Sequence, residues 1–196
     1  MTEDINVALQ VLKKGGVILY PTDTIWGIGC DATNAKAVSK VYAIKQRSDA
    51  RSMLVLLDDA GSLARYLQEV PEIAWDLIEL SDEPLTIIYS GAKNLAKNLV
   101  PPDGTIGIRI TRDEFCRKLI RQFRKPVVST SANISGKSWP ENFDAIDPAI
   151  LQRVDYTVKW RQEDHAKGRP SAIIRLGIKG EIEIIRKQTI KKSDSL

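Results

Sequence analysis

The 196-residue chain is predicted to be one α/β domain with a mixed, twisted β-sheet and flanking helices. Short apolar runs typical of strands alternate with stretches of helical period along the whole chain. No repeat, low-complexity stretch or linker divides it, and its 43% hydrophobic content is enough to bury a core. We expect that core to span about residues 5–186, with residues 187–196 forming a basic tail.

The N-terminal part of the chain is predicted to alternate helices and strands. Apolar residues at helical spacing over 5–12 stop at a Gly-Gly pair, after which 17–20 has the pattern of a strand. A second helix is expected over 35–46, with Asn34 as its N-cap. The apolar run 53–57 then predicts a buried strand.

Beyond this strand the same alternation continues. Thr111 and Glu114 have the spacing of a capping box for a helix that ends near Phe123. The segment 137–147 is expected to be a loop, because a Trp-Pro pair and an Asp-Pro pair interrupt any regular pattern. The other expected elements are helices at 63–67 and 73–80 and strands at 85–89, 105–110, 127–128, 156–158, 172–174 and 182–185.

Composition excludes several classes of protein. Cys30 and Cys116 lie far apart and His165 is the sole histidine, so no zinc site of the usual Cys/His type is expected. The longest apolar runs are too short to span a bilayer, and the acidic start is unlike a signal peptide, which predicts a cytoplasmic protein with no membrane partner. The formal charge of +4 is too small to indicate nucleic-acid binding, but it is compatible with polyanionic ligands.

Two apolar runs end in segments rich in hydroxyl groups. One has the sequence P-V-V-S-T-S-A-N-I-S-G over residues 126–136, where we expect the strand to end at Val128 and a polar loop to follow. The other contains P-T-D-T over 21–24, followed by closely spaced glycines. Such segments either bind a polar ligand or form ordinary strand-to-helix turns, in which Ser, Thr and Asn side chains cap backbone groups.

Lys45 and Arg47 lie at the C-terminal end of the helix predicted over 35–46. An Arg side chain offers phosphate oxygens a planar, bidentate fork, and a Lys side chain offers them a compact charge. The alternative is a solvated helix end, where the helix dipole favours positive charge.

Together, the P-T-D-T segment, the pair Lys45/Arg47 and the pair Ser131/Asn133 resemble the YrdC family of threonylcarbamoyl-adenylate synthases. In that family a K-x-R pair and an S-x-N pair carry nucleotide recognition. The resemblance extends over about residues 15–186, nearly the whole chain. It implies the YrdC fold, with a concave ligand cleft on one side of the sheet.

The resemblance implies a nucleotidyltransferase that combines L-threonine, bicarbonate and ATP, in the presence of Mg²⁺, into threonylcarbamoyl-adenylate and pyrophosphate. This product serves the threonylcarbamoyladenosine modification of tRNA. The threonine amine captures bicarbonate or carbon dioxide as a carbamate, whose oxygen attacks the α-phosphorus, so no covalent enzyme nucleophile is needed. Catalysis of this kind rests on aligning the reactants and on neutralising phosphate charge with Lys, Arg, hydroxyl donors and Mg²⁺.

The resemblance also implies roles for individual residues. Lys45 and Arg47 are expected to be catalytic, through their contacts with the phosphates. Thr105 and Arg109 lie four residues apart on a predicted strand and therefore share a face, with Thr105 expected toward ATP and Arg109 toward the threonine carboxylate. The expected ATP-binding residues are Lys45, Arg47, Arg51, Thr105, Ser131, Asn133, Ser138 and Arg186, the expected threonine-binding residues are Thr24, Arg109, Ser129 and Ser171, and no residue is expected to bind a metal directly.

The chain departs from the family pattern at several positions. Leu56 stands where a His is common, which removes a polar group from the expected threonine pocket, and Ala172 replaces the Thr of a P-S-T motif. Trp139 stands where a small hydroxyl residue often approaches ATP. Either Ser138 takes that role after a one-residue shift, or Trp139 stacks on the base.

An alternative function is that of a YrdC-like paralogue, which binds tRNA, double-stranded RNA or a nucleotide without making the adenylate. A carbamoyl-transfer domain of the kind found in hydrogenase-maturation proteins is disfavoured, because the chain carries no zinc-finger or acylphosphatase-like extension. The sequence also ends before the extra C-terminal domain of the longer synthases. We therefore expect separate threonylcarbamoyl-transfer proteins to receive the adenylate.

Overall fold

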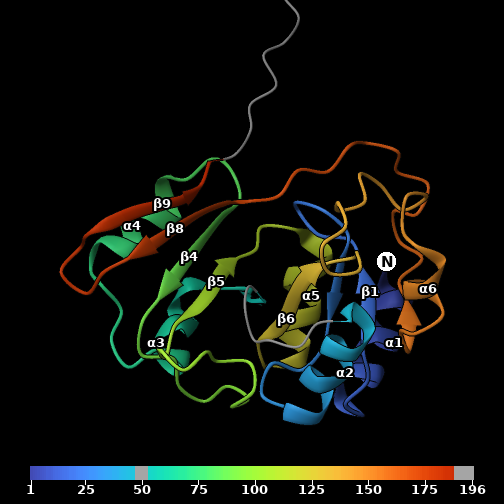
Figure 1. Ribbon diagram of the computed structural model, residues 1–196, viewed down its shortest axis with the longest axis horizontal. Helices are drawn as coiled ribbons and strands as arrows, with labels where there is room; N and C mark the ends of the chain where they lie inside the picture. The colour runs from blue at the N-terminus through green and yellow to red at the C-terminus, as the bar shows by residue number, and fades with distance from the viewer. Residues whose placement is uncertain (47–52, 188–196) are drawn as a thin grey trace, which may run out of the picture.

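The computed structural model of the protein describes residues 1–46 and 53–187 (Figure 1). Helices and strands are interleaved along both ranges, as the sequence predicts. The helices are α1 (Thr2–Lys13), α2 (Ala35–Lys45), α3 (Leu63–Tyr66), α4 (Ile73–Leu80), α5 (Glu114–Phe123) and α6 (Pro148–Leu151), with a 3₁₀ turn, η1, at Ala60–Ser62. The strands are β1 (Ile18–Tyr20), β2 (Gly27–Gly29), β3 (Leu54–Leu57), β4 (Leu85–Tyr89), β5 (Ile106–Ile110), β6 (Val127–Ser131), β7 (Tyr156–Thr157), β8 (Ala172–Leu176) and β9 (Ile182–Arg186).

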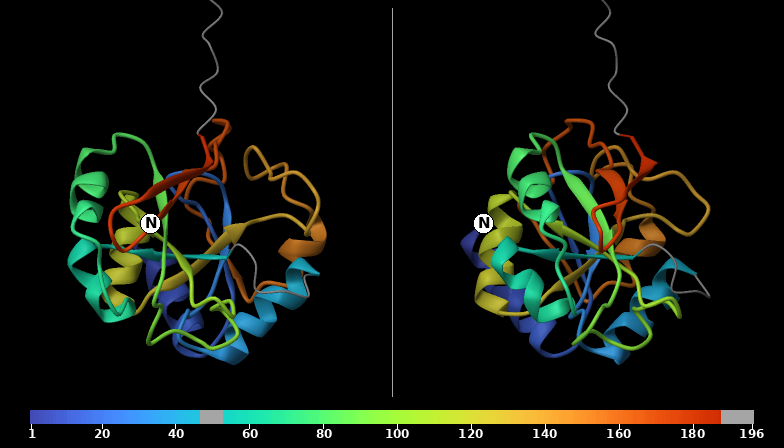
Figure 2. Two further views of the ribbon diagram at one scale, coloured as in Figure 1. Left: turned by 60° about the vertical axis from the view of Figure 1, so that its left-hand side comes forward. Right: turned by 90° about the vertical axis from the view of Figure 1, so that its left-hand side faces the viewer.

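Within these ranges the strands form one nine-stranded sheet, in the order β7-β1-β2-β6-β3-β5-β4-β8-β9. The pairs β1–β7, β3–β5 and β4–β8 are parallel, and the other neighbouring pairs are antiparallel. The sheet twists strongly from end to end, as the two views of Figure 2 show. The predicted α/β fold with a mixed, twisted sheet is therefore confirmed.

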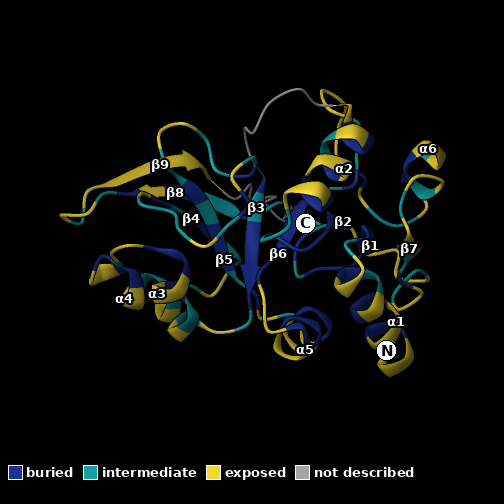
Figure 3. Ribbon diagram, turned by 90° about the horizontal axis from the view of Figure 1, so that it is seen from below, coloured by how far each residue is buried: buried dark blue, intermediate teal, exposed yellow. Residues whose placement is uncertain are grey.

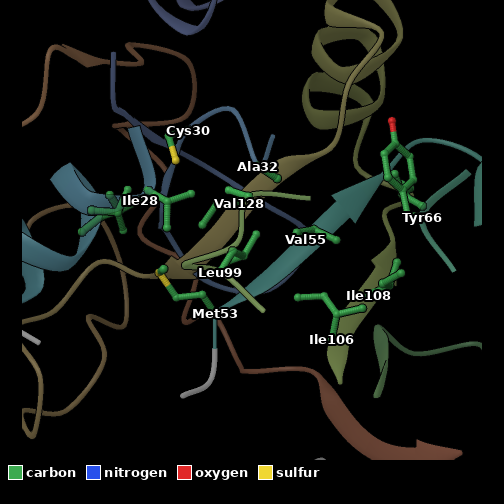
Figure 4. Packing of buried hydrophobic residues seen from close by; sticks show 14 of the residues in the cluster. Ile28, Cys30, Ala32, Met53, Val55, Tyr66, Leu99, Ile106, Ile108 and Val128 are labelled. Carbon is green, nitrogen blue, oxygen red and sulfur yellow. The ribbon is translucent and has the colours of Figure 1, made fainter. Parts of the chain in front are cut away.

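Helices cover both faces of the sheet. Figure 3 and the right-hand view of Figure 2 place α1 and α5 together on one side and α2 on the other. A larger apolar cluster includes residues of α2, α3 and α4, and a smaller one includes residues of α1 and α5. Successive side chains of a strand point to opposite faces, so Val55 of β3 belongs to the larger cluster and Leu56 to the smaller. Figure 4 shows Val55 packing in the larger cluster with Ile106, Ile108 and Leu99.

The smaller cluster occupies only part of its face of the sheet. Val127 of β6 belongs to this cluster, and Ser129 and Ser131 follow it on the same face of the same strand. On β3, Leu56 is completely buried in the cluster, whereas Leu54 lies at its edge. Beyond α1 and α5, the same face of the sheet thus becomes polar.

Several local predictions are confirmed. Asn34 caps α2, because its side-chain oxygen accepts hydrogen bonds from the N–H groups of Lys36 and Ala37. The helix predicted over 73–80 and the strand predicted over 85–89 both have the expected bounds. The short helix α6 was not expected from the sequence. It begins at Pro148, a residue that favours the first turn of a helix, after the N-cap Asp147.

The predicted capping box at the start of α5 is wrong. Asp113 caps this helix instead, and its carboxylate accepts a hydrogen bond from the N–H of Cys116. The hydroxyl of Thr111 accepts a bond from the Asp113 N–H, and Glu114 pairs with Lys118 one turn further along the helix. The helix begins two residues later than the box requires, because Asp113 has the extended backbone of an N-cap.

The polar loop expected after Val128 is also partly wrong, because Ser129-Thr130-Ser131 continues β6. Neighbouring strands on both sides hold this segment, with Ser129 opposite Leu54 and Ser131 opposite Gly27. The closely spaced glycines likewise form strand β2 and not a turn. At Gly29 a Cβ atom would lie 2.6 Å from both Tyr20 Cε1 and the Val128 carbonyl oxygen, so this strand needs glycine for close packing.

Candidate active site

A cavity of about 350 Å³ opens over the polar part of the sheet face. Its walls come from the start of β2, the end of α2, the middle of β5, the end of β6 with the loop that follows, and the C-terminal strands. The lining residues are Thr24, Ile25, Gly27, Lys45, Leu54, Arg109, Ser129, Thr130, Ser131, Asn133, Ser135, Gly136, Trp139, Pro170, Ser171, Ile173 and Arg186.

Lys45, the last residue of α2, joins that helix to the end of β6. Its side chain is 3% exposed, and its ammonium group donates hydrogen bonds to the backbone oxygens of Ser131 (2.6 Å) and Asn133 (2.8 Å). In return, the N–H of Ser135 donates to the Lys45 carbonyl oxygen over 3.0 Å. A buried ammonium group costs free energy unless polar atoms surround it, so these carbonyl groups hold the positive charge in the cavity wall.

Asn133 shapes the loop after β6. Its amide nitrogen donates hydrogen bonds to the carbonyl oxygens of Ile134 (3.1 Å) and Lys137 (2.5 Å). Its side-chain oxygen is buried and has no hydrogen-bond partner among the residues that the structure describes. Asn133 thus keeps one unused acceptor in a side chain that lines the cavity.

Arg109 supplies a second buried positive charge, from the middle of β5. It is 3% exposed, and its Nη2 lies 3.1 Å from Oδ1 of Asp23. Its Nε atom is buried and makes no hydrogen bond within the described ranges. The guanidinium thus has a carboxylate partner on one side and an unused donor on another.

Arg186 and Ser171 close the cavity at the C-terminal strands. Nε and Nη2 of Arg186 both donate to the Ser171 carbonyl oxygen, over 3.0 and 2.9 Å. The hydroxyl of Ser171 pairs with that of Thr86 over 2.8 Å. Burial, and then the positive charge of Arg109, lower the pKa of Arg186. An anion bound between the two guanidinium groups would relieve this repulsion.

Hydroxyl groups form the wall between these cations. The hydroxyls of Thr22 and Thr24 lie 2.9 Å apart, and Thr22 also donates to the Ile25 carbonyl oxygen. Thr22 therefore stabilises the turn, whereas Thr24 lines the cavity. At Gly27 a Cβ atom would lie 3.2 Å from the Ser129 hydroxyl, so glycine keeps the approach to that hydroxyl open.

Most of the predicted site residues that the structure describes meet at this one cavity. Thr105 does not line it. The Thr105 hydroxyl donates to the Asp103 carboxylate over 2.7 Å in the turn before β5. Thr105 is four residues from Arg109, a separation of roughly 13 Å along an extended chain. Ser138 is exposed and does not line it either, whereas the neighbouring Trp139 does. Arg47 and Arg51 lie outside the described residues.

The expected effect of Leu56 on the cavity is wrong. Leu56 is completely buried among the apolar residues packed against α1 and α5, and it does not line the cavity. Leu54, two residues earlier on the same face of β3, takes that place. Ala172 is also absent from the lining, which includes its neighbours Ser171 and Ile173.

Sequence reasoning missed the apolar part of the lining. Ile25, Leu54, Pro170 and Ile173 carry no chemical group that singles them out from core residues. Trp139 was considered, and its 48% exposed side chain is a further apolar surface beside the polar wall. Only the packing of distant segments could identify these residues as parts of one site.

No group of three or more His, Cys, Asp and Glu side chains within residues 1–46 and 53–187 could hold a metal ion. Both cysteines are free and buried, and burial raises the pKa of each thiol. No helix in the same ranges is long and apolar enough to cross a membrane.

The chain is similar in sequence to proteins of one known family. The model of the Sua5/YciO/YrdC family, which carries the description "telomere recombination", matches residues 10–188. The threonylcarbamoyl-AMP synthase of Pseudoalteromonas translucida is 36% identical over 157 residues, which cover 79% of this chain and 84% of that protein.

Two solved structures share the fold. Sua5 of P. abyssi, crystallised with L-threonine, matches with a TM-score of 0.78 at 22% identity, over 88% of this chain and 50% of that one. The chain thus corresponds to about half the length of that Sua5 protein. YciO of E. coli matches with a TM-score of 0.79 at 23% identity, over 96% of this chain and 90% of that one.

Proposed function

The chain belongs to the Sua5/YciO/YrdC family, and we propose that it is an L-threonylcarbamoyladenylate synthase, a nucleotidyltransferase that condenses L-threonine, bicarbonate and ATP. One observation carries the proposal. A single cavity combines the cations Lys45, Arg109 and Arg186 with a wall of hydroxyl groups, although these residues lie far apart in the sequence. The name of the relative from Pseudoalteromonas translucida, threonylcarbamoyl-AMP synthase, supports the same activity.

The charge of the cavity suits the proposed substrates. Threonine carries a carboxylate, the carbamate adds a second negative charge, and ATP brings its phosphates. Among the described lining residues there are three cationic side chains and no Asp or Glu. Such a site attracts anions and stabilises the negative charge that develops during transfer to the α-phosphorus.

The two substrates are expected to bind toward different walls. Arg109, Ser129 and Ser171 would surround the amino acid, with the guanidinium facing its carboxylate. Lys45, at the end of α2 and β6, would face the phosphates. Arg186, which is expected to bind ATP, contacts the carbonyl oxygen of Ser171, which is expected to bind threonine, so Arg186 would stand where the two substrates meet.

The chain's own residues would act by binding and orientation. The proposed reaction needs the carbamate oxygen in line with the α-phosphorus and the departing pyrophosphate, and it needs no covalent bond to the protein. Lys45 is held by two carbonyl oxygens and Arg109 by Asp23, so both charges are oriented before the substrates arrive. A site of this kind avoids the cost of reorganising charges during the reaction.

We expect Mg²⁺ to enter with ATP. Because no carboxylate is found among the described lining residues, the phosphates and water would hold most of its coordination sphere, as is common for this ion. When bound, Mg²⁺ would neutralise charge on the transferring phosphate group. The cavity would offer such a complex hydroxyl oxygens, including those of Ser129 and Ser131.

The direct test is an assay of the products. The protein should release pyrophosphate from ATP in a way that requires both L-threonine and bicarbonate, and mass spectrometry should detect threonylcarbamoyl-adenylate. Each of several other amino acids, offered in place of threonine, serves as a control for the substrate. Pyrophosphate release that does not depend on threonine or on bicarbonate contradicts the proposal.

The later steps are part of the same proposal. We expect separate proteins to transfer the threonylcarbamoyl group to tRNA, and we expect the enzyme to work in the cytoplasm. Binding of tRNA or double-stranded RNA that weakens steeply with salt, without any adenylate synthesis, would instead favour the paralogue that binds RNA.

A further inference from the structure

Asp23 lies directly behind the cavity wall, in contact with Arg109. It belongs to the P-T-D-T segment, but its carboxylate does not line the cavity, whereas the neighbouring Thr24 does. Its Oδ1 atom is 3.1 Å from Arg109 Nη2, and the two side chains are 15% and 3% exposed. A guanidinium this deeply buried needs a carboxylate partner, because desolvation of an unpaired charge is costly.

The carboxylate of Asp23 is itself fixed from behind. Its Oδ2 atom accepts hydrogen bonds from the Thr111 hydroxyl (3.2 Å) and from the N–H of Arg112 (3.3 Å), just after β5. Thr111 is 1% exposed, and its hydroxyl also accepts a bond from the N–H of Asp113, the N-cap of α5. Asp23 therefore links the turn before β2 to the strand that carries Arg109.

The geometry of the pair leaves part of the guanidinium unused. The contact is an ion pair and not an aligned hydrogen bond, since Asp23 Oδ1 receives no hydrogen bond from the described residues. Arg109 Nε is buried and also lacks an acceptor there. Asp23 thus restrains one amino group of the fork, while Nε of the same fork makes no hydrogen bond among the described residues and the Arg109 side chain lines the cavity.

From these contacts we propose that Asp23 is a positioning residue, which holds the Arg109 guanidinium in the orientation that receives the carboxylate of the amino-acid substrate. This inference rests on the proposed function for the identity of that substrate. Asp23 does not touch the reacting atoms and acts through Arg109. Without it, the guanidinium would turn toward other acceptors, and a misplacement of about 1 Å costs on the order of 100-fold in a reaction that depends on alignment.

The test compares Asp23→Asn with Asp23→Glu. Asparagine keeps the size of the side chain and can still accept bonds from Thr111 and Arg112, but it loses the charge. We expect the KM for L-threonine to rise about 10- to 100-fold in Asp23→Asn, with the KM for ATP changed by less than about twofold. Asp23→Glu should recover part of the loss, because it restores the carboxylate.

Asp58→Asn is a matched control. Asp58 also pairs with an arginine, Arg121, over 3.4 Å, and its side chain is 16% exposed, but it lies away from the cavity. This variant should retain both KM values. Equal rises in the KM for threonine and for ATP in Asp23→Asn, or a loss of thermal stability without a change in either, would show a merely structural role and overturn the inference.

A second measurement needs no substrate turnover. The Nε–H signal of Arg109, assigned by its loss in Arg109→Lys, should exchange with water faster in Asp23→Asn than in the wild-type protein when followed by ¹⁵N NMR. Unchanged exchange overturns the positioning role even if the enzyme is active. Failure of the wild-type protein to form the adenylate contradicts the proposed function instead, so the two failures can be told apart.

Discussion

Two parts of one sheet face differ in what lies above them. Under α1 and α5, the strands present Val127 and Leu56 to a closed apolar cluster. Further along the same strands, Ser131 and Leu54 border an open cavity that three cationic side chains line, two of them buried. The backbone is similar in both parts, so the covering helices decide which part contributes stability and which part binds ligands.

The two parts also satisfy their buried groups differently. The apolar part needs no polar partners, since each large side chain fully removed from water contributes roughly 1.5–3 kcal/mol. The cavity part contains Lys45 and Arg109, which are tolerated only because carbonyl oxygens and Asp23 surround them. Substitutions should therefore affect mainly stability in the first part and mainly activity in the second.

The largest effect is expected in the apolar part. Phe115 of α5 is completely buried, so Phe115→Ala should lower the free energy of unfolding by about 3–5 kcal/mol. The KM values of the protein that remains folded should not change. Urea denaturation measures the first quantity, and Ile184→Ala, at a 60% exposed position on β9, is the control. A change in KM without destabilisation would contradict the division between the two parts.

Lys45→Met should have the next largest effect, on activity. Methionine preserves much of the side-chain length but removes the charge that faces the cavity and the bonds to Ser131 and Asn133. We expect adenylate formation to fall by about 100- to 1,000-fold, measured as pyrophosphate release. Lys118→Met, which removes an exposed lysine on α5, should leave the rate unchanged. Near-normal activity of Lys45→Met would argue against its proposed contact with phosphate.

The pair Leu56→Asn and Leu54→Asn tests where the boundary between the two parts lies. Leu56→Asn places an amide in the apolar cluster and should cost about 2–3 kcal/mol of stability. Leu54→Asn places the same group at the cavity and should cost about 1 kcal/mol or less, with a change in threonine binding instead. Thermal unfolding and calorimetric titration with threonine measure the two effects. Equal destabilisation would place the boundary elsewhere.

The smallest effect is expected at the rim of the cavity. Trp139→Ala should raise the KM for ATP on the order of tenfold, if the indole stacks on the base, and should change stability by less than about 0.5 kcal/mol. Trp160→Ala is the matched control, because Trp160 is 40% exposed and does not line the cavity. A KM for ATP equal to that of the control would remove the stacking role.

Local patterns predicted those elements whose stability depends on neighbouring residues in the sequence. The Asn34 cap of α2 and the bounds of α4 and β4 follow from side chains within one or two turns or one strand. The start of α5 was misplaced because Thr111 and Asp113 are both good caps, and the bond from Thr111 to Asp23, 88 positions away, is invisible in a local pattern.

For the candidate site, residue chemistry and family motifs were sufficient to select Lys45, Arg109, Ser131 and Asn133, all of which meet at the cavity. Their proposed contacts with substrates stay predictions. The same reasoning placed Leu56 wrongly, because spacing along a strand fixes the face of a residue but not its distance from the cavity along that strand. Thr105 lies outside the cavity lining, and its contact with ATP stays a prediction.

The sequence by itself determined the α/β class, most of the elements and the polar residues available for binding, since these depend on local periodicity and side-chain chemistry. Only the tertiary structure decided that β6 continues through Ser131, that Asp23 stands behind Arg109 and that Leu54 replaces Leu56 at the cavity. The first two outcomes depend on strand pairing and side-chain contacts between distant segments, and the third depends on where α1 and α5 end over the sheet. Packing between segments distant in the sequence decides all three, and no local pattern encodes it.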